Sequence, residues 1–236
     1  MLDYPFLVDT FLVALSGAPT ALLVTVIALL IAIPAGFLFA IIRTNQIKLL
    51  DRVVQVYVSF VRGTPMIVQI FIIYNSVPIL LKTAFAQMNV QVDIYNVNPI
   101  WYAFIVFSLN TTAILSEVFR SALGTVNKGQ LEAAQTVGLT NVQAYREIMI
   151  PQLLVIALPN ICTATTNLIK ATSLGYAMSL QEITLKAKVA ANANYNYIEA
   201  YIDIFLVYLI LCSLVEYGFK VYEKRLRIYK VASTVE

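Results

Sequence analysis

Long windows without a charged residue constrain this chain more than any other feature of its sequence. A helix needs about 20 mostly apolar residues to cross the hydrocarbon core of a bilayer. Soluble domains carry about a quarter charged residues, whereas this chain of 236 residues is 12% charged and 60% hydrophobic. It is therefore predicted to be an all-α integral membrane protein. Four charge-free windows have a suitable length: Thr20–Ile42, Gly63–Leu81, Pro99–Ser116 and Ile148–Ile169.

A fifth window, Ile198–Phe219, is weaker because it contains Glu199, Asp203 and Glu216. We still count it as a span, since aromatic residues of the kind found at membrane interfaces flank its clean centre. The sequence thus predicts a transmembrane domain over residues 20–222, followed by a cytoplasmic tail over 223–236. Its five spans are placed at 20–42, 63–81, 99–119, 148–173 and 198–219.

The distribution of positive charge predicts the orientation. Lysine and arginine accumulate in cytoplasmic loops, and twelve of the sixteen here fall after the first, third and fifth spans. This places the N-terminus outside and the C-terminus in the cytoplasm. The first twenty residues have no lysine or arginine, so they lack the basic start of a signal peptide. Because Phe6–Leu15 is too short to span, residues 1–19 are expected to form an interfacial helix on the external side.

Residues suited to catalysis or metal binding are scarce. The chain has no histidine, which is the usual proton shuttle and the commonest metal ligand. It lacks the glycine-rich G-x-x-x-x-G-K-[ST] loop that cradles nucleotide phosphates. Cys162 and Cys212 lie in predicted spans and form no disulfide framework. We therefore expect no enzyme activity, no metal and no cofactor bound by this chain, and its charge gives no reason to expect nucleic acid.

The most polar long stretch is GQLEAAQTVGLTNVQAYREIMIPQ, residues 129–152. It is predicted to form two short helices that turn at Gly138, with Glu132 projecting and Ala133 and Ala134 leaving backbone exposed to another surface. Asn141 is expected to cap the second helix. An apolar stripe of Val142, Tyr145 and Ile148 or Met149 then needs a cover. That cover is either the spans of the same chain or a docked partner.

This stretch resembles the signature of ABC importer permeases. The signature is E-A-A-x3-G-x9-I-x-L-P. The chain matches it with Glu132–Ala134, then Gly138 after three residues, then Ile148–Pro151 after nine more, with Ile150 where leucine is usual. The match is long and specific. It places the signature inside the polar loop, which we number 128–151.

Three further motifs resemble the polar amino acid branch of that family, which carries histidine, arginine, glutamine, glutamate and cystine. Arg62–Gln69 resembles R-G-T-P-L-L-V-Q. Glu117–Arg120 resembles E-I-F-R, with Ser121–Ala122 where two glycines are common. Lys170–Leu174 resembles K-D-T-S-L, with Ala171 in place of aspartate. The resemblance covers nearly the whole chain.

What the resemblance implies is a type I importer permease in a bacterial cell membrane. It would pair with an identical or homologous permease, sit on a dimer of ATP-binding subunits that hold ATP and Mg, and receive a polar amino acid from a solute-binding protein. The loop would be the coupling helix, with Glu132, Ala133, Ala134 and Gly138 as its contact residues. Sequence alone does not give the amino acid.

Polar groups inside spans suggest where a substrate would pass. Glu117 and Lys170 are charged, and charge within a bilayer is costly. Small polar residues cluster at 110–112 and 163–167. Ion pairing, snorkelling and helix packing are the competing explanations. The expected substrate path comprises Asn110, Thr112, Glu117, Thr166, Asn167, Lys170, Thr172 and Ser173.

Two other functions are weighed against an ATP-driven permease. A self-contained secondary transporter or channel would need its own coupling-ion site, and the sequence shows about five spans and no inverted repeat. A membrane-embedded enzyme would need reactive groups, which are missing. An assembly subunit that binds no substrate stays open, since one member of an unequal permease pair can lack that role.

Overall fold

The computed structural model describes residues 3–88, 96–125 and 128–231, and this part of the chain is helical with no strand. A π-helical turn, η2, and a 3-10 helix, η3, interrupt or extend the α-helices. The elements are α1 (Tyr4–Leu15), α2 (Ala18–Thr44), α3 (Lys48–Gly63), α4 (Met66–Gln87), α5 (Pro99–Thr125), α6 (Lys128–Thr136), α7 (Asn141–Ala144), η2 (Tyr145–Met149), α8 (Ile150–Ala171), η3 (Thr172–Met178), α9 (Ile183–Ala191) and α10 (Tyr197–Val231).

Five helical runs in the described residues are long and apolar enough to cross a membrane, which confirms the predicted five-span, all-α fold. Four of them are centred on α4, α5, α8 and α10. The remaining run joins α1 to α2 across Ser16–Gly17 and extends over 41 residues, Tyr4–Thr44. α2, α5 and α10 extend beyond the predicted spans, because polar residues continue a helix beyond the hydrocarbon core, whereas α8 lies within its predicted bounds. The helix of the second predicted span, α4, starts later than predicted, at Met66, because Thr64 and Pro65 before it are in extended conformations.

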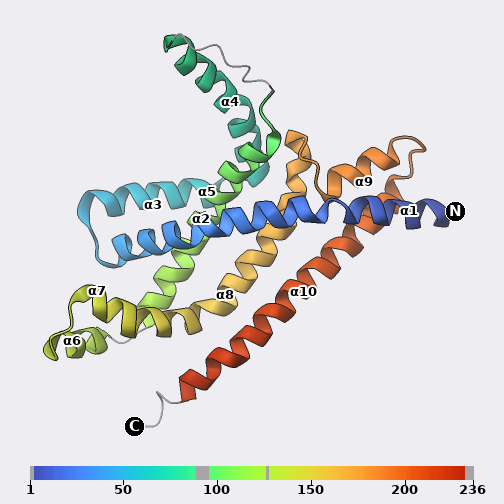
Figure 1. Cartoon of the computed structure of the whole chain (residues 1–236). Coiled ribbons are helices and arrows are strands. Elements are labelled where there is room, and N and C mark those ends of the chain that lie inside the picture. The colour runs from blue at the N-terminus through green and yellow to red at the C-terminus, as the bar shows by residue number, and fades with distance from the viewer. Residues whose placement is uncertain (1–2, 89–95, 126–127, 232–236) are drawn as a thin grey trace.

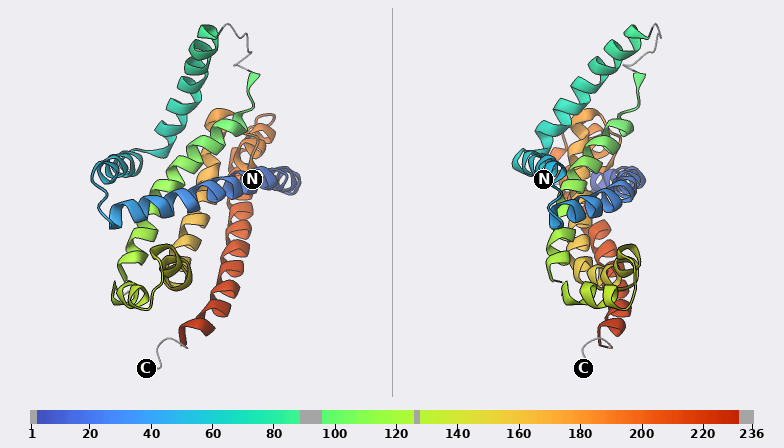
Figure 2. Two further views of the ribbon diagram at one scale, coloured as in Figure 1. Left: turned by 60° about the vertical axis from the view of Figure 1, so that its left-hand side comes forward. Right: turned by 90° about the vertical axis from the view of Figure 1, so that its left-hand side faces the viewer.

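The arrangement has α5 at its centre (Figure 1). α6 and α7 lie at one end of the molecule, together with the C-terminal end of α10, and α9 and α1 lie at the other. We call these the α7 end and the α9 end. Figure 2 shows α4 leaving the bundle at an angle, and few of its residues are buried by this chain.

The α2–α5 pair is the most extensive helix contact, and small residues make it possible. Ala28, Ala32, Gly36 and Ala40 recur every four residues along one face of α2, and all are buried. A Cβ atom on Gly36 would lie 3.1 Å from Leu115 Cβ of α5. In lipid, where apolar side chains gain little by associating, such small-residue faces let two backbones approach closely and gain dispersion energy.

The helix α3 was not predicted from the sequence. Its inward face carries Val54, Val58 and Val61, which pack with Ile42 of α2 and Ala113 of α5. The Tyr57 hydroxyl donates a hydrogen bond of 2.5 Å to the Leu109 carbonyl of α5. The charged residues between the first two spans indicated only a cytoplasmic loop. The three-to-four-residue valine spacing was the available signal for a helix.

The segment from Gln181 to Glu199 contains α9, which packs on α1 and α10. The buried Glu182 side chain caps α9 by accepting hydrogen bonds from the Thr184 and Leu185 amides, and it also accepts one from the Tyr208 hydroxyl of α10. Lys186 of α9 donates to the Ser16 carbonyl at the α1–α2 junction. The α9 end is therefore a packed unit.

Candidate functional site

The turn between α6 and α7 is defined by Gly138. Its φ of +89° lies in the left-handed region, where a side chain is strained. The Gly138 amide donates to the Gln135 carbonyl, and the Leu139 amide donates to the Ala134 carbonyl. These two bonds form a Schellman motif, which ends α6 and satisfies carbonyls that would otherwise be unpaired. The predicted turn at Gly138 is confirmed.

The second helix of the pair is capped by Thr140, and the prediction that Asn141 caps it was wrong. Thr140 accepts from the Gln143 amide, while the Gln143 side chain accepts from the Thr140 amide, so the two residues form a capping box. Asn141 instead accepts a 2.7 Å hydrogen bond from Gln135 of α6. That bond joins the two helices across the turn. The α6–α7 hairpin, residues 128–144, is therefore stabilised locally on both sides of Gly138.

The predicted apolar stripe is split by the π-helical turn η2. Met149 is buried, and Tyr145 packs against the same core cluster of α2, α5 and α8 residues. Val142 points away, with 77% of its surface exposed. A π-helical turn adds a residue to the helix repeat and rotates side chains off an α-helical face, which explains the error.

The α6–α7 hairpin presents an uncovered surface at the tip of the α7 end. Glu132, Ala133, Val137 and Val142 are exposed there, and Val137 is 78% exposed. Ala134 is buried, so the prediction that it offers exposed backbone was wrong, and its carbonyl serves the Schellman motif instead. The two exposed valines and the Glu132 carboxylate, which has no ion pair within the described residues, form a mixed surface typical of contact with another protein.

Glu117 lies in an ion-pair cluster of α2, α3 and α5. Its carboxylate pairs with the Arg43 guanidinium of α2 and with Arg120, one turn away at 2.8 Å. Asp51 of α3 lies 3.9 Å from Arg43. The side chains of Arg43 and Glu117 are only 17% and 20% exposed. Glu117 therefore joins helices through charge, which is the competing role foreseen for it in the sequence.

Asn110 connects α5 to α4. Its side-chain amide donates to the Gln69 side-chain oxygen at 3.2 Å. Gln69 is itself buried and donates to the carbonyls of Val61 and Thr64, at the junction of α3 and α4. This network satisfies backbone groups freed where the chain bends before Pro65.

The remaining hydroxyl candidates differ in position. Thr112 is buried and donates to the Ser108 carbonyl in its own helix. Thr172 is also buried, donates to the Ile169 carbonyl, and lies 3.3 Å from the Tyr208 hydroxyl of α10. Ser173 is half-buried in η3. These three do not line the cavity described next.

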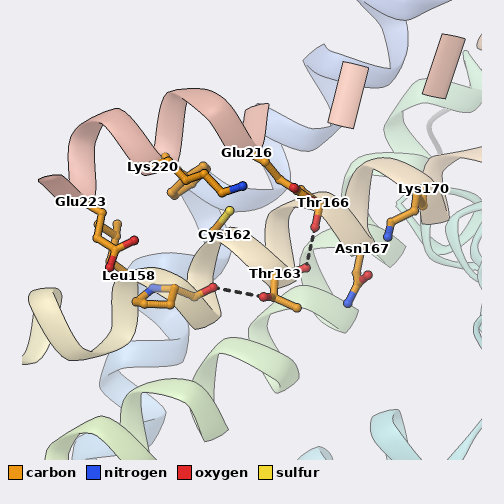
Figure 3. Close-up of a pocket in the computed structure, with 11 residues that line it drawn as sticks. Leu158, Cys162, Thr163, Thr166, Asn167, Lys170, Glu216, Lys220 and Glu223 are labelled. Atoms are coloured by element: carbon orange, nitrogen blue, oxygen red, sulfur yellow. Dashed lines mark hydrogen bonds between the residues drawn. The ribbon is translucent and has the colours of Figure 1, made fainter. Parts of the chain in front are cut away.

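Thr166, Asn167 and Lys170 share one cavity. It has a volume of about 380 Å³ and lies between α8 and α10 (Figure 3). Such a volume falls within the range of about 300–1,000 Å³ usual for small-molecule pockets. Thr166 donates to the Thr163 carbonyl, and Thr163 donates to the Pro159 carbonyl, within their own helix. The lining residues are Leu158, Pro159, Cys162, Thr163, Thr166, Asn167, Lys170, Glu216, Phe219, Lys220 and Glu223.

The α10 wall of this cavity was missed in the sequence. Glu216, Lys220 and Glu223 are spaced four and three residues apart, so they share one face of α10. From the sequence, Glu216 was counted only as a charge that weakens the fifth span, and Lys220 and Glu223 were assigned to the cytoplasmic side. A charge at the centre of a bilayer costs at least about 2.5–3.5 kcal/mol, so a face with several charges is unsuited to lipid. The spacing of these charges was the available signal.

Comparison with known proteins gives the family. The family model described as "Binding-protein-dependent transport system inner membrane component" matches residues 32–228. The probable amino-acid permease protein YxeN of Bacillus subtilis (strain 168) is 35% identical over 210 residues, which are 89% of each chain. A crystal structure described as an amino acid ABC transporter with histidines superposes with a TM-score of 0.77 at 25% identity, covering 95% of this chain and 99% of that one. The chain belongs to the amino-acid ABC importer permeases.

Other similarities agree with that assignment. The L-cystine transport system permease protein TcyL of Bacillus subtilis (strain 168) is 32% identical to this permease over 209 residues, covering 89% of this chain and 85% of that protein. The inward-facing MetNI methionine ABC transporter superposes with a TM-score of 0.66 at 16% identity, over 95% of this chain and 99% of that one. At that identity the MetNI likeness shows the fold alone. The permease is thus a transmembrane subunit of an ABC importer.

Proposed function

We propose that this permease works in pairs, identical or homologous, on a dimer of ATP-binding subunits, and passes a polar amino acid from a solute-binding protein across a bacterial cell membrane. ATP and Mg belong to the ATP-binding subunits, and this chain hydrolyses nothing. The family assignment supports the partners, and the named relatives include permeases for amino acids and for cystine. The excess of lysine and arginine in the loops after the first, third and fifth spans supports an external N-terminus, with the α7 end in the cytoplasm.

The α6–α7 hairpin is the proposed contact with the ATP-binding subunit, and its exposed surface is the observation that carries the proposal. The Schellman motif and the capping box hold the hairpin in one conformation, so it transmits displacement instead of absorbing it. Glu132, Ala133, Val137 and Val142 form the contact face, while Gly138 and Ala134 shape it. ATP-dependent closure of the partners would bias the permease between its two arrangements through this contact.

The experiment is charge reversal at Glu132. We expect Glu132→Lys to insert normally and to lower ATP-driven uptake in vesicles at least tenfold, because a repulsive charge at a packed interface costs one to several kcal/mol, about 1.4 kcal/mol per factor of ten. The quantities measured are uptake and ATP hydrolysis stimulated by the binding protein. Glu147→Lys is the matched control, since Glu147 is exposed on the neighbouring η2. Undiminished uptake by Glu132→Lys would contradict the docking role.

For the substrate path we propose a route past α5 and α8. It includes the cavity residues Thr166, Asn167 and Lys170, and η3 with Thr172 and Ser173. Asn110, Thr112 and Glu117 belong to the proposed route through α5, and the hydrogen bonds and ion pairs of Asn110 and Glu117 give both a role in holding the helices that enclose it. The charged, uncovered α8–α10 face is the main support, because such a face requires water or protein opposite it.

A further inference from the structure

We propose that the α8–α10 cavity is a binding site for an amino acid with no net charge, in which Glu216 takes the ammonium group and Lys220 the carboxylate. This inference rests on the proposed transport function and adds the α10 wall and the charge class of the substrate. Figure 3 shows α8 supplying Thr163, Asn167 and Lys170 on one side and α10 supplying Glu216 and Lys220 on the other.

The two α10 charges are available to a ligand. Within the described residues, neither Glu216 nor Lys220 makes a hydrogen bond or an ion pair, and both side chains are exposed to the cavity. They are four residues apart on a helix, so their Cβ atoms are about 5–6 Å apart. The ammonium and carboxylate groups of an α-amino acid are both attached to its α-carbon and can bridge that spacing with two charge-assisted hydrogen bonds.

The α8 wall provides polar contacts without an excess of charge. Thr163 and Asn167 are exposed there, and one turn further along Lys170 closes the cavity. The amide and hydroxyl can exchange hydrogen bonds with an uncharged polar side chain. Leu158, Pro159 and Phe219 give the cavity an apolar part that can contact the carbon atoms of a ligand.

The charges of the lining residues cancel. Lys170 and Lys220 stand opposite Glu216 and Glu223, so the lining has equal numbers of positive and negative side chains. Between walls with balanced charges, a ligand that brings a net charge leaves that charge uncompensated. The site therefore favours glutamine-like amino acids over arginine and glutamate, which is discrimination by electrostatic mismatch.

Cys162 provides a direct test, because its thiol lines the cavity and Cys212→Ser leaves it the only cysteine of the chain. The assembled complex in lipid nanodiscs is treated with N-ethylmaleimide, and labelling of this chain is followed by mass spectrometry. We expect Cys162 to be labelled and glutamine to slow labelling at least fivefold, with a smaller effect of arginine or glutamate. Asn167→Cys, with Cys162→Ser and Cys212→Ser, is a second reporter from the same wall.

Neutralising each α10 charge should shift the protection in opposite directions. Glu216→Gln removes a negative charge from the site, so protection by glutamate relative to protection by glutamine should rise at least threefold. Lys220→Gln removes a positive charge, so protection by arginine relative to protection by glutamine should rise at least threefold. A purely structural role would not reverse the preference. Lys224→Gln is the control, since Lys224 is exposed on α10 outside the cavity.

The outcomes separate this inference from the proposed function. If neither reporter is labelled, if no amino acid protects, or if arginine or glutamate protects the unaltered site best, the inference is wrong. ATP-driven uptake by the same complex is measured in parallel. Uptake that persists while protection fails overturns the site alone, and absence of ATP-driven uptake by the unaltered complex overturns the proposed function.

Discussion

At the scale of single residues, Glu117 shows how a carboxylate within a span joins two helices. It pairs with Arg43 of α2 and Arg120 of α5, and Asp51 of α3 lies near the same guanidinium. The Arg43 Nε atom is buried and has no hydrogen-bond partner in the described structure. Arg43 therefore depends on its carboxylate neighbours, and the Glu117 charge is the closest of them.

We expect Glu117→Gln to destabilise the permease by about 1–3 kcal/mol, the usual cost of leaving a buried polar group without its partner, because the Arg43 charge keeps only the more distant Asp51. Thermal or chemical unfolding of the purified complex measures this. Arg120→Gln is the matched control and should cost less, since Arg120 is 44% exposed and water replaces its contact. An effect of Glu117→Gln on uptake with no loss of stability would instead favour direct contact with substrate.

At the scale of helices, Glu182 determines how α9 attaches to α10. Both carboxylate oxygens are occupied, one by the Leu185 amide and the other by the Thr184 amide and the Tyr208 hydroxyl. An amide side chain has a single acceptor oxygen, so it cannot satisfy all three donors. The carboxylate therefore acts both as a helix cap and as a link between helices.

Glu182→Gln should lower the unfolding free energy by about 1–3 kcal/mol, the usual cost of leaving a buried donor unpaired. Melting of the complex in detergent checks this value. Tyr208→Phe tests the link separately from the cap, and we expect a smaller loss of about 0.5–1.5 kcal/mol for one hydrogen bond. Equal stability of Glu182→Gln and the unaltered protein would mean that the three contacts contribute nothing net.

At the scale of the whole molecule, polar elements are separated between two ends. The α2–α3 hairpin and the α6–α7 hairpin lie toward the α7 end, and α9 with its following turn lies at the other (Figure 1). The spans between them expose leucine, isoleucine and phenylalanine side chains over most of their outer faces. This distribution is that of a protein surrounded by hydrocarbon, with both ends in water.

Sidedness is tested with single cysteines in a chain carrying Cys162→Ser and Cys212→Ser. A membrane-impermeant maleimide should label Asn45→Cys, in the α2–α3 turn, only in inside-out vesicles. Asn194→Cys, after α9, should be labelled only in right-side-out vesicles. Both asparagines are exposed, so the two variants are matched in chemistry and access. The reverse pattern would invert the proposed orientation.

The sequence by itself determined the five spans and the α6–α7 turn. The free energy of transferring a helix into lipid is a sum over neighbouring residues, so a window of about 20 residues is enough to predict a span. The turn depends on local bonds around Gly138, which involve residues close in sequence. Local patterns gave wrong predictions at Asn141 and Val142. Thr140 caps the helix in place of Asn141. The π-helical turn separates Val142 from the face that Met149 occupies.

Only the tertiary structure decided the rest. Glu117 pairs with an arginine 74 positions earlier in the chain, and α3 is a helix because its valines find cover on α2 and α5. The sequence grouped eight residues in one proposed path, yet of these only Thr166, Asn167 and Lys170 share the α8–α10 cavity. Their grouping depends on the α10 helix lying beside α8, and such a contact between distant segments is set by packing, which no local pattern encodes.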